Sequence, residues 1–188
     1  MLYHQTPSVK PTAQTAIVAA SKGRLIVSHE AAVPTLQSDM ILVKTVAVAL
    51  NPCDHKTVDN FPTPGAFAGC DFAGVIVDIG YGVRQTQYRI GDRVCGAVHG
   101  SNPACLTSGS FAQYVGATAD ILLKIPDSMS FEEAAAIGGT GITTAGMALF
   151  NSMQLPGNPF EPAAKASFVL VYGASTATGT MCLQMLKL

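Results

Sequence analysis

Between Thr15 and Lys124 the chain contains a series of strand-like segments, in which apolar residues form short runs or alternate with polar ones. Val, Ile, Thr and Phe are frequent there, and alternation over a short stretch is typical of a half-buried strand. Strands are therefore expected in TAIVAA (15–20), RLIVSHE (24–30), MILVKTVAVAL (40–50), FAGVIVDIG (72–80), IGDRVCGAV (90–98) and SFAQYVGA (110–117). Residues 51–71 are rich in Pro and Gly and are interpreted as a loop. Because the strands are unevenly spaced, the pattern predicts an irregular β unit rather than a regular sandwich.

The pattern changes at Ile125. Ser130 is followed three positions later by Glu133, which is the spacing of a helical capping box, and a run of alanines follows. A helix is expected to begin here. Gly138 and Gly139 are expected to end it, and residues 140–150 are expected to form a second, closely packed helix.

The carboxyl-terminal segment reads as connector, strand, turn and helix. Residues 154–167 are rich in Pro and Gly, and FVLVY (168–172) has the continuous apolar character of a buried strand. A turn with Gly173 and Gly179 follows, and such a turn can bind phosphate through free amide groups at the start of a helix. Thr176 replaces the middle glycine of the usual fingerprint, so ordinary packing and dinucleotide binding both remain open.

Composition and charge exclude several classes of protein. Hydrophobic residues make up 48% and charged residues 12% of the chain, which favours a buried core over disorder. The net charge is -1 without runs of either sign, so neither nucleic acid nor an anionic membrane is an expected partner. No apolar stretch is long enough to cross a bilayer and no secretory signal is visible, so a cytoplasmic location is expected. The five cysteines form no CxxC pair and are best interpreted as free thiols.

Six motifs bear on the choice between ordinary packing and dinucleotide binding at the turn with Gly173 and Gly179. They are AVALNPCDHK, GCDFAGVIVDIGYGV, IGDRVCG, GSFAQYV, IPDSMSFEEAAAIGGTGITTAGMAL and VLVYGAS. In this order they resemble the quinone-reductase-like, zinc-free branch of the medium-chain dehydrogenase/reductase superfamily. GITTAG and STAT make the resemblance closest to trans-acting enoyl reductases that assist fungal polyketide synthases. The resemblance spans residues 15–188.

The resemblance implies an α/β fold in three parts. Residues 1–125 correspond to a GroES-like, β-rich catalytic domain, 126–166 to a helical connection, and 167–188 to the first βα unit of a Rossmann nucleotide-binding domain. Family members are about twice as long, because a Rossmann domain needs several further βα units. The chain is therefore expected to be truncated, to bind NADPH weakly by itself and to be poorly soluble.

The resemblance also implies site residues. Lys56 and Thr144 are the expected catalytic residues, although Lys56 could be a solvated loop lysine and Thr144 a small packing residue. Asp54 is interpreted as orienting its loop or capping a short helix rather than as a base. Contacts to NADPH are implied for Cys53, Asp54, His55, Lys56, Ser175, Thr176, Ala177 and Thr178. The resemblance further implies that an apolar acyl chain lies against Ala145, Gly146, Met147, Ala148, Leu149, Phe150, Asn151 and Ser152. The alternative is that these residues simply form a helix of the core.

No metal is expected. In the zinc-dependent branch a Cys occupies the position of Asn51 and a GHE motif that of Gly69 to Asp71, which leaves Cys70 as the only ligand here.

The function implied is hydride transfer from NADPH to the carbon–carbon double bond of a polyketide acyl chain, in secondary-metabolite biosynthesis. The expected partner is the polyketide synthase that presents the acyl chain, and the expected state is a monomer. Two alternatives stay open: a stand-alone quinone or enone oxidoreductase, and a catalytically silent fragment that only docks with a partner.

Overall fold

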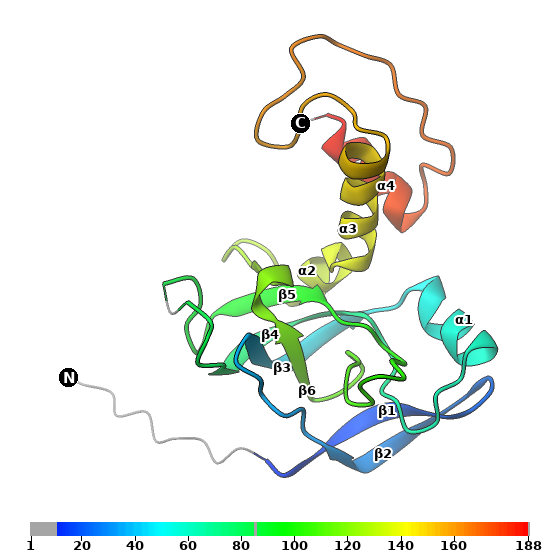
Figure 1. Cartoon of the computed structure of the whole chain (residues 1–188), viewed down its shortest axis with the longest axis vertical. Coiled ribbons are helices and arrows are strands. Elements are labelled where there is room, and N and C mark those ends of the chain that lie inside the picture. The colour runs from blue at the N-terminus through cyan, green and yellow to red at the C-terminus, as the bar shows by residue number, and fades with distance from the viewer. Residues whose placement is uncertain (1–10, 85, 188) are drawn as a thin grey trace.

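The structure, a computed structural model, describes residues 11–84 and 86–187. Two antiparallel strands, β1 (Ala13–Ser21) and β2 (Arg24–Ala32), form a separate ribbon at the base of the molecule (Figure 1). The tight turn between them places Gly23 at a φ of 66°, a conformation that glycine adopts without steric cost. Both strands lie where the alternating pattern predicts them.

A five-stranded antiparallel sheet forms the body of the molecule. Its spatial order is β6-β3-β4-β5-β7, and a short 3-10 helix, η1 (Ala119–Ile121), precedes β7. The strands are β3 (Met40–Ala49), β4 (Asp71–Ile79), β5 (Arg93–Ala97), β6 (Tyr114–Thr118) and β7 (Leu123–Lys124). The main core packs on one face of this sheet and includes Ile41, Val43, Phe72, Ile76, Val94 and Val115. The predicted β-rich unit is confirmed, and β7 is an addition to it.

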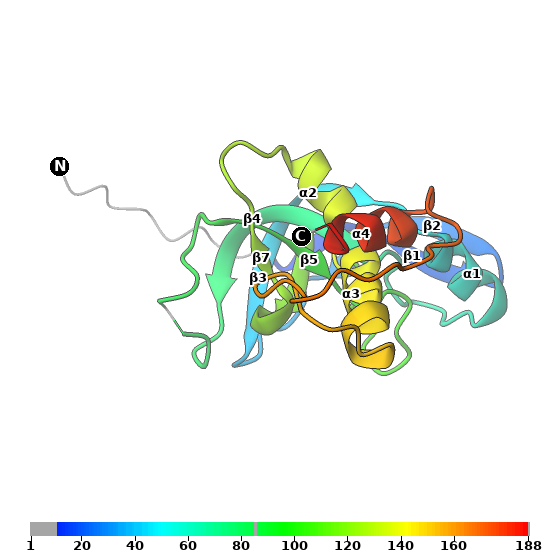
Figure 2. The same ribbon diagram turned by 90° about the horizontal axis from the view of Figure 1, so that it is seen from above.

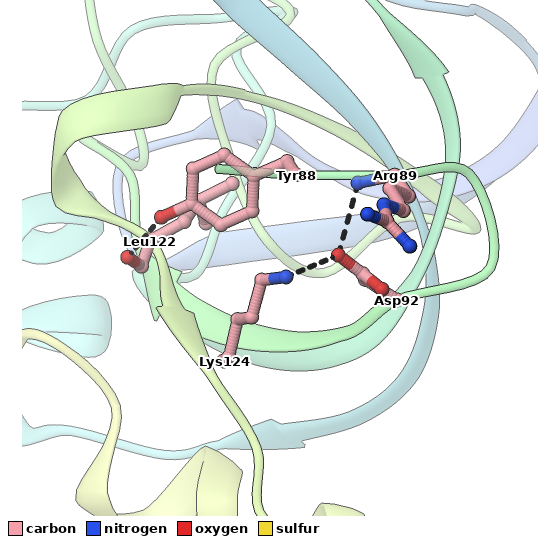
Figure 3. Close-up of polar contacts among 5 residues, drawn as sticks. All are labelled: Tyr88, Arg89, Asp92, Leu122 and Lys124. Atoms are coloured by element: carbon pink, nitrogen blue, oxygen red, sulfur yellow. Dashed lines mark hydrogen bonds and ion pairs between the residues drawn. The ribbon is translucent and has the colours of Figure 1, made fainter. Parts of the chain in front are cut away.

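Polar contacts hold the edge of this sheet together (Figure 3). The buried Tyr88 hydroxyl donates a 2.6 Å hydrogen bond to the carbonyl oxygen of Leu122, and burial raises the pKa of Tyr88. Lys124 Nζ lies 2.7 Å from Asp92 Oδ2, and this bond holds the pKa of Asp92 below its ordinary value. These contacts tie the loop before β5 to β7.

The predicted loop at residues 51–71 contains a helix, α1 (Pro52–Asn60), so its interpretation as a loop was wrong for its first half. The segment Pro52–Asn60 contains one proline and several charged residues but no apolar stripe, so its pattern does not indicate a helix. Pro52 nevertheless suits the first helical position, where its missing N–H has no helical partner to lose. A single side chain, Val58, is buried from this helix.

Three further helices lie above the sheet. They are α2 (Phe131–Ile137), α3 (Thr140–Gly146), which continues as a π-helical turn η2 (Met147–Ser152), and α4 (Ala177–Met185). The capping box is confirmed: the Glu133 amide donates to Ser130 Oγ and Glu133 Oε2 accepts from the Ser130 amide. Figures 1 and 2 show α2 against the β unit and α3 rising away from it with α4 alongside, an arrangement called the helical arm below.

The strand predicted at residues 168–172 is wrong. This segment has no strand structure, and the side chains of Phe168, Leu170 and Tyr172 are essentially fully exposed. A strand exists through hydrogen bonds to a neighbouring strand, and no described residue offers it one. The apolar run alone was therefore not sufficient to predict a strand.

No helix in residues 11–84 and 86–187 is both long and apolar enough to span a membrane. The predicted domain boundaries at residues 125 and 166 stay predictions.

Candidate functional site

A buried carboxylate, that of Asp71, joins the β unit to the helical arm. Its Oδ1 accepts hydrogen bonds from the Gly139 amide (3.1 Å), the Thr140 amide (2.9 Å) and the Thr140 hydroxyl (2.7 Å). Its Oδ2 accepts a 2.8 Å bond from Asn51 Nδ2. Asp71 is only 2% exposed, and no described basic side chain forms an ion pair with it. We call this carboxylate and its donors the Asp71 hub.

The Asp71 hub forms at the break between helices α2 and α3. Gly138 separates α2 from α3 at a φ of 46°, and a Cβ atom there would lie 2.5 Å from the carboxyl carbon of Asp71. Glycine at this position therefore allows the backbone between α2 and α3 to approach the Asp71 carboxylate closely. The free amides that follow, at the start of α3, are donors that a buried carboxylate satisfies well.

The start of α1 is fixed by its own carboxylate. Asp54 Oδ2 accepts a 2.7 Å hydrogen bond from the Asn51 amide, so Asp54 caps the helix that it belongs to. The interpretation of Asp54 as an orienting or capping residue is confirmed. Because Asn51 also donates to Asp71, the beginning of α1 is tied to the hub.

Two thiols lie beside this helix start. Cys53 Sγ and Cys70 Sγ are 4.0 Å apart, and both cysteines are partly buried. Burial raises the pKa of Cys53, with the nearby Asp54 carboxylate adding to the effect, and burial raises the pKa of Cys70 to about 12. Asp54 Oδ1 is buried next to them without a hydrogen-bond partner. The site is thus a compact group of two protonated thiols and a carboxylate oxygen.

The interpretation of Cys70 as the only available ligand was too narrow. Cys53, Asp54 and Cys70 place their donor atoms within 4.8 Å of one another, although no His joins them. Sequence spacing could not show this, because Cys53 and Cys70 are 17 positions apart and only the fold brings them together. The absence of a metal in the working protein stays a prediction.

The other predicted residues of α1 point to solvent. His55 and Lys56 are exposed, as is Thr144 on α3. No hydrogen bond or ion pair within the described part of the chain joins Lys56 to Thr144 or to residues 173–178. The roles assigned to Lys56 and Thr144 therefore remain predictions.

The turn before α4 has the features expected of a phosphate-binding turn. Gly173 has a φ of 81°, and a Cβ atom on the buried Gly179 would overlap the Gly173 carbonyl oxygen. Thr176 Oγ1 accepts from the Gly179 amide at 3.0 Å and caps the helix. The amides of Ser175, Ala177 and Thr178 have no partner among the described residues. These amides can donate to an anion.

The predicted acyl-binding stretch divides into two sides. Ala145 and Leu149 are buried against Cys182 of α4, so they pack the helical arm together. Phe150 lines a cavity of about 290 Å³ that also touches Met185. The remaining members are half-buried or exposed: Gly146, Met147, Ala148, Asn151 and Ser152. Binding of an acyl chain here stays a prediction.

Sequence reasoning missed the two hub residues. It treated Asn51 and Asp71 only as replacements for zinc-site residues, not as partners of each other. The available signal was an acidic residue at the start of a continuous apolar strand, since a carboxylate in such a position needs several donors.

The chain has a family match and close relatives among known proteins. Residues 37–127 match the alcohol dehydrogenase GroES-like domain family. A trans-enoyl reductase of Aspergillus clavatus is 56% identical over 180 residues, which are 95% of this chain and 50% of the relative. A trans-enoyl reductase of Pyricularia oryzae is 51% identical over 178 residues, with the same coverage of 95% and 50%.

The fold is also found among solved structures. An alcohol dehydrogenase superfamily protein from Novosphingobium aromaticivorans superposes with a TM-score of 0.77 at 24% identity, covering 92% of this chain and 49% of that one. The chain thus spans about half the length of the curated relatives that it matches. The predicted α/β fold with a GroES-like unit is confirmed, because residues 37–127 match that domain family and the fold matches an alcohol dehydrogenase superfamily protein. The resemblance to fungal trans-enoyl reductases is confirmed as well, since these proteins are sequence relatives of the chain.

Proposed function

We propose that this chain supplies the catalytic domain of an NADPH-dependent trans-enoyl reductase that reduces the carbon–carbon double bond of a polyketide acyl chain. The observation that carries the proposal is identity of 56% and 51% to proteins named trans-enoyl reductases, over 95% of this chain. The acyl chain would be presented by a polyketide synthase, and the enzyme would act as a cytoplasmic monomer.

The described residues fit one edge of a cofactor site. The exposed turn before α4 offers the unpartnered amides of Ser175, Ala177 and Thr178 to the phosphates, and Gly173 permits close approach of the backbone. NADPH, when bound, supplies the hydride. Across the molecule, Cys53, Asp54, His55 and Lys56 at the start of α1 would form the edge nearer the nicotinamide.

Lys56 has a specific role in this proposal. Its exposed ammonium group would donate a hydrogen bond to the nicotinamide ribose or to the enolate oxygen that develops during reduction. The Thr144 hydroxyl, exposed on α3, would lie near the nicotinamide. The Asp71 hub supports both residues indirectly, because it fixes the start of α1 against the start of α3.

The decisive experiment joins this chain to the carboxyl-terminal half of the Aspergillus clavatus relative and follows NADPH oxidation with a carrier-bound enoyl thioester. The joined protein should turn over, whereas the 188-residue chain alone should show little NADPH affinity in a fluorescence titration. Tight binding of NADPH by the short chain would contradict the need for further βα units.

Lys56→Met in the joined protein tests the assigned role. A hydrogen bond that involves a charged group contributes about 1.5–3 kcal/mol, so its loss should lower kcat/KM by about ten- to a hundredfold. Lys22→Met, at the exposed β1–β2 turn, is the matched control and should leave kcat/KM unchanged. An equal effect of both variants would remove Lys56 from the site.

Substrate preference separates the two enzymatic alternatives. The proposal requires faster turnover of the carrier-bound enoyl chain than of a simple quinone at equal concentration. A preference for the quinone would favour the stand-alone oxidoreductase, and no turnover of either by the joined protein would favour a docking fragment.

A further inference from the structure

The two thiols beside the Asp71 hub have a chemistry of their own. Cys53 Sγ and Cys70 Sγ lie 4.0 Å apart, one at the second residue of α1 and the other just before β4. From this geometry we infer that Cys53 and Cys70 form a redox-active dithiol, which peroxide converts into an intramolecular disulfide. The inference does not depend on the reductase activity.

The sulfur atoms need only a small movement to bond. A disulfide has an S–S length of about 2.05 Å, so the gap must close by about 2 Å, shared between two side chains. Helix α1 can follow this movement, because only one of its side chains, Val58, is buried. Cys95 and Cys182 are both buried in apolar clusters, and Cys105 is exposed with Thr107 as its polar contact. No other pair of the five cysteines has a sulfur contact in the described part of the chain.

The reaction balances with hydrogen peroxide as the oxidant. One thiolate attacks a peroxide oxygen, the O–O bond breaks, and the sulfur becomes a sulfenic acid as one water leaves. The second sulfur then attacks the sulfenic sulfur, the S–S bond forms, and a second water leaves. Both thiols together lose two electrons and two protons, and the peroxide accepts them.

The surroundings set the rate and the consequence of the reaction. Burial raises the pKa of both thiols, so little thiolate is present at neutral pH and oxidation needs excess peroxide. Cys53 and Cys70 are 17 positions apart, so the bond would tie the start of α1 directly to the start of β4. It would thereby lock the segment that Asn51 now holds by a hydrogen bond to Asp71.

The test uses the reduced 188-residue chain in a buffer with a chelator. After peroxide treatment, removal of the oxidant and alkylation of remaining thiols, trypsin separates the two cysteines into peptides 45–56 and 57–84, each with one cysteine. The expected product is these two peptides joined, with a mass about 2 Da below their sum because two hydrogens leave. Free thiols should fall from five to three and return on treatment with dithiothreitol.

Matched variants show whether the pair is specific. Cys53→Ser and Cys70→Ser should each abolish the joined peptides, whereas Cys105→Ser, which removes an exposed cysteine, should leave them unchanged. If a serine variant fails to fold, the wild-type chain oxidised in concentrated urea serves instead, because unfolding should spread the disulfides over many pairs. Recovery of peptides 45–56 and 57–84 as separate alkylated or overoxidised species would overturn the inference. The same pattern of pairs in native and denatured chains would overturn it as well.

Discussion

Replacing Asp71 with alanine should be among the most damaging single substitutions in this protein. The carboxylate is 2% exposed and accepts four hydrogen bonds, from Asn51, from the Gly139 amide and from the amide and hydroxyl of Thr140. Alanine removes all four at once. The donors stay behind, and those that water cannot reach lose their partner outright.

The magnitude follows from how buried each donor is. An unsatisfied buried donor costs about 1–3 kcal/mol. The hydrogen bond from the Gly139 amide is buried, so the Gly139 amide bears the largest single cost. The bonds from the Thr140 amide, the Thr140 hydroxyl and Asn51 Nδ2 are part-buried and each add a smaller cost. Asp71→Ala should therefore lower the free energy of unfolding by about 3–5 kcal/mol, a large part of the 5–15 kcal/mol typical of a domain.

Urea denaturation followed by circular dichroism measures this loss, with two further variants beside it. Asp71→Asn keeps the shape of the side chain and the oxygen that faces Thr140, but it places an NH₂ group opposite the side-chain NH₂ group of Asn51. Because two donors then face each other, this variant should lower the free energy of unfolding by about 1–2 kcal/mol. Asn51→Ala removes one donor and should cost about 1 kcal/mol. A loss below about 1 kcal/mol for Asp71→Ala would refute the reasoning, because the donors would then have found other partners.

Three smaller predictions concern the sheet edge and the helix break. Tyr88→Phe should lower the free energy of unfolding by about 1 kcal/mol. Because the pKa of Tyr88 is raised in the folded state, this difference from wild type should shrink above about pH 10. Urea titrations at two pH values measure it, and a constant difference would contradict the reasoning. Lys124→Met should cost less than about 1 kcal/mol. Since the pKa of Asp92 is lowered in the fold, that cost should begin to shrink as pH falls below about 4, the ordinary carboxyl value, and should vanish only below the lowered pKa of folded Asp92. A cost that stays constant throughout this acid range would argue against the ion pair. Gly138→Ala should lower the free energy of unfolding by about 2–4 kcal/mol, because the new Cβ atom would lie 2.5 Å from the carboxyl carbon of Asp71. Gly91→Ala should cost only about 1 kcal/mol, because its Cβ atom meets nothing within 4 Å. Equal melting temperatures of the two variants would refute the crowding at Gly138.

The sequence predicted what depends on local pattern. Alternation located the strands of the β unit, and the spacing of Ser130 and Glu133 located the start of α2, because both signals are carried by residues close together in the chain. Helix α1 was missed because its stabilising contacts are a proline at the first position and a carboxylate cap, not an apolar stripe. The strand at 168–172 was predicted from its composition, which says nothing about whether a partner strand exists.

The candidate site shows the same division. The residues of the start of α1 and of the turn before α4 came from motif resemblance, and the structure adds that Gly173 has a positive φ and lies against Gly179. The hub did not come from the sequence, because Asp71 and Thr140 are 69 positions apart and only the fold brings them together. The thiol pair was hidden for the same reason, since a spacing of 17 residues carries no known signature.

The long connector between η2 and α4 decides which part of the molecule a protease would release first. Residues 153–176 contain no helix or strand, and nearly all of their side chains are exposed. Lys165 is the single site for trypsin within them. After a cut there, only the apolar cluster that α4 shares with α3 and η2 would hold the last helix in place, so brief digestion should trim the protein from its carboxyl end while the β unit survives intact.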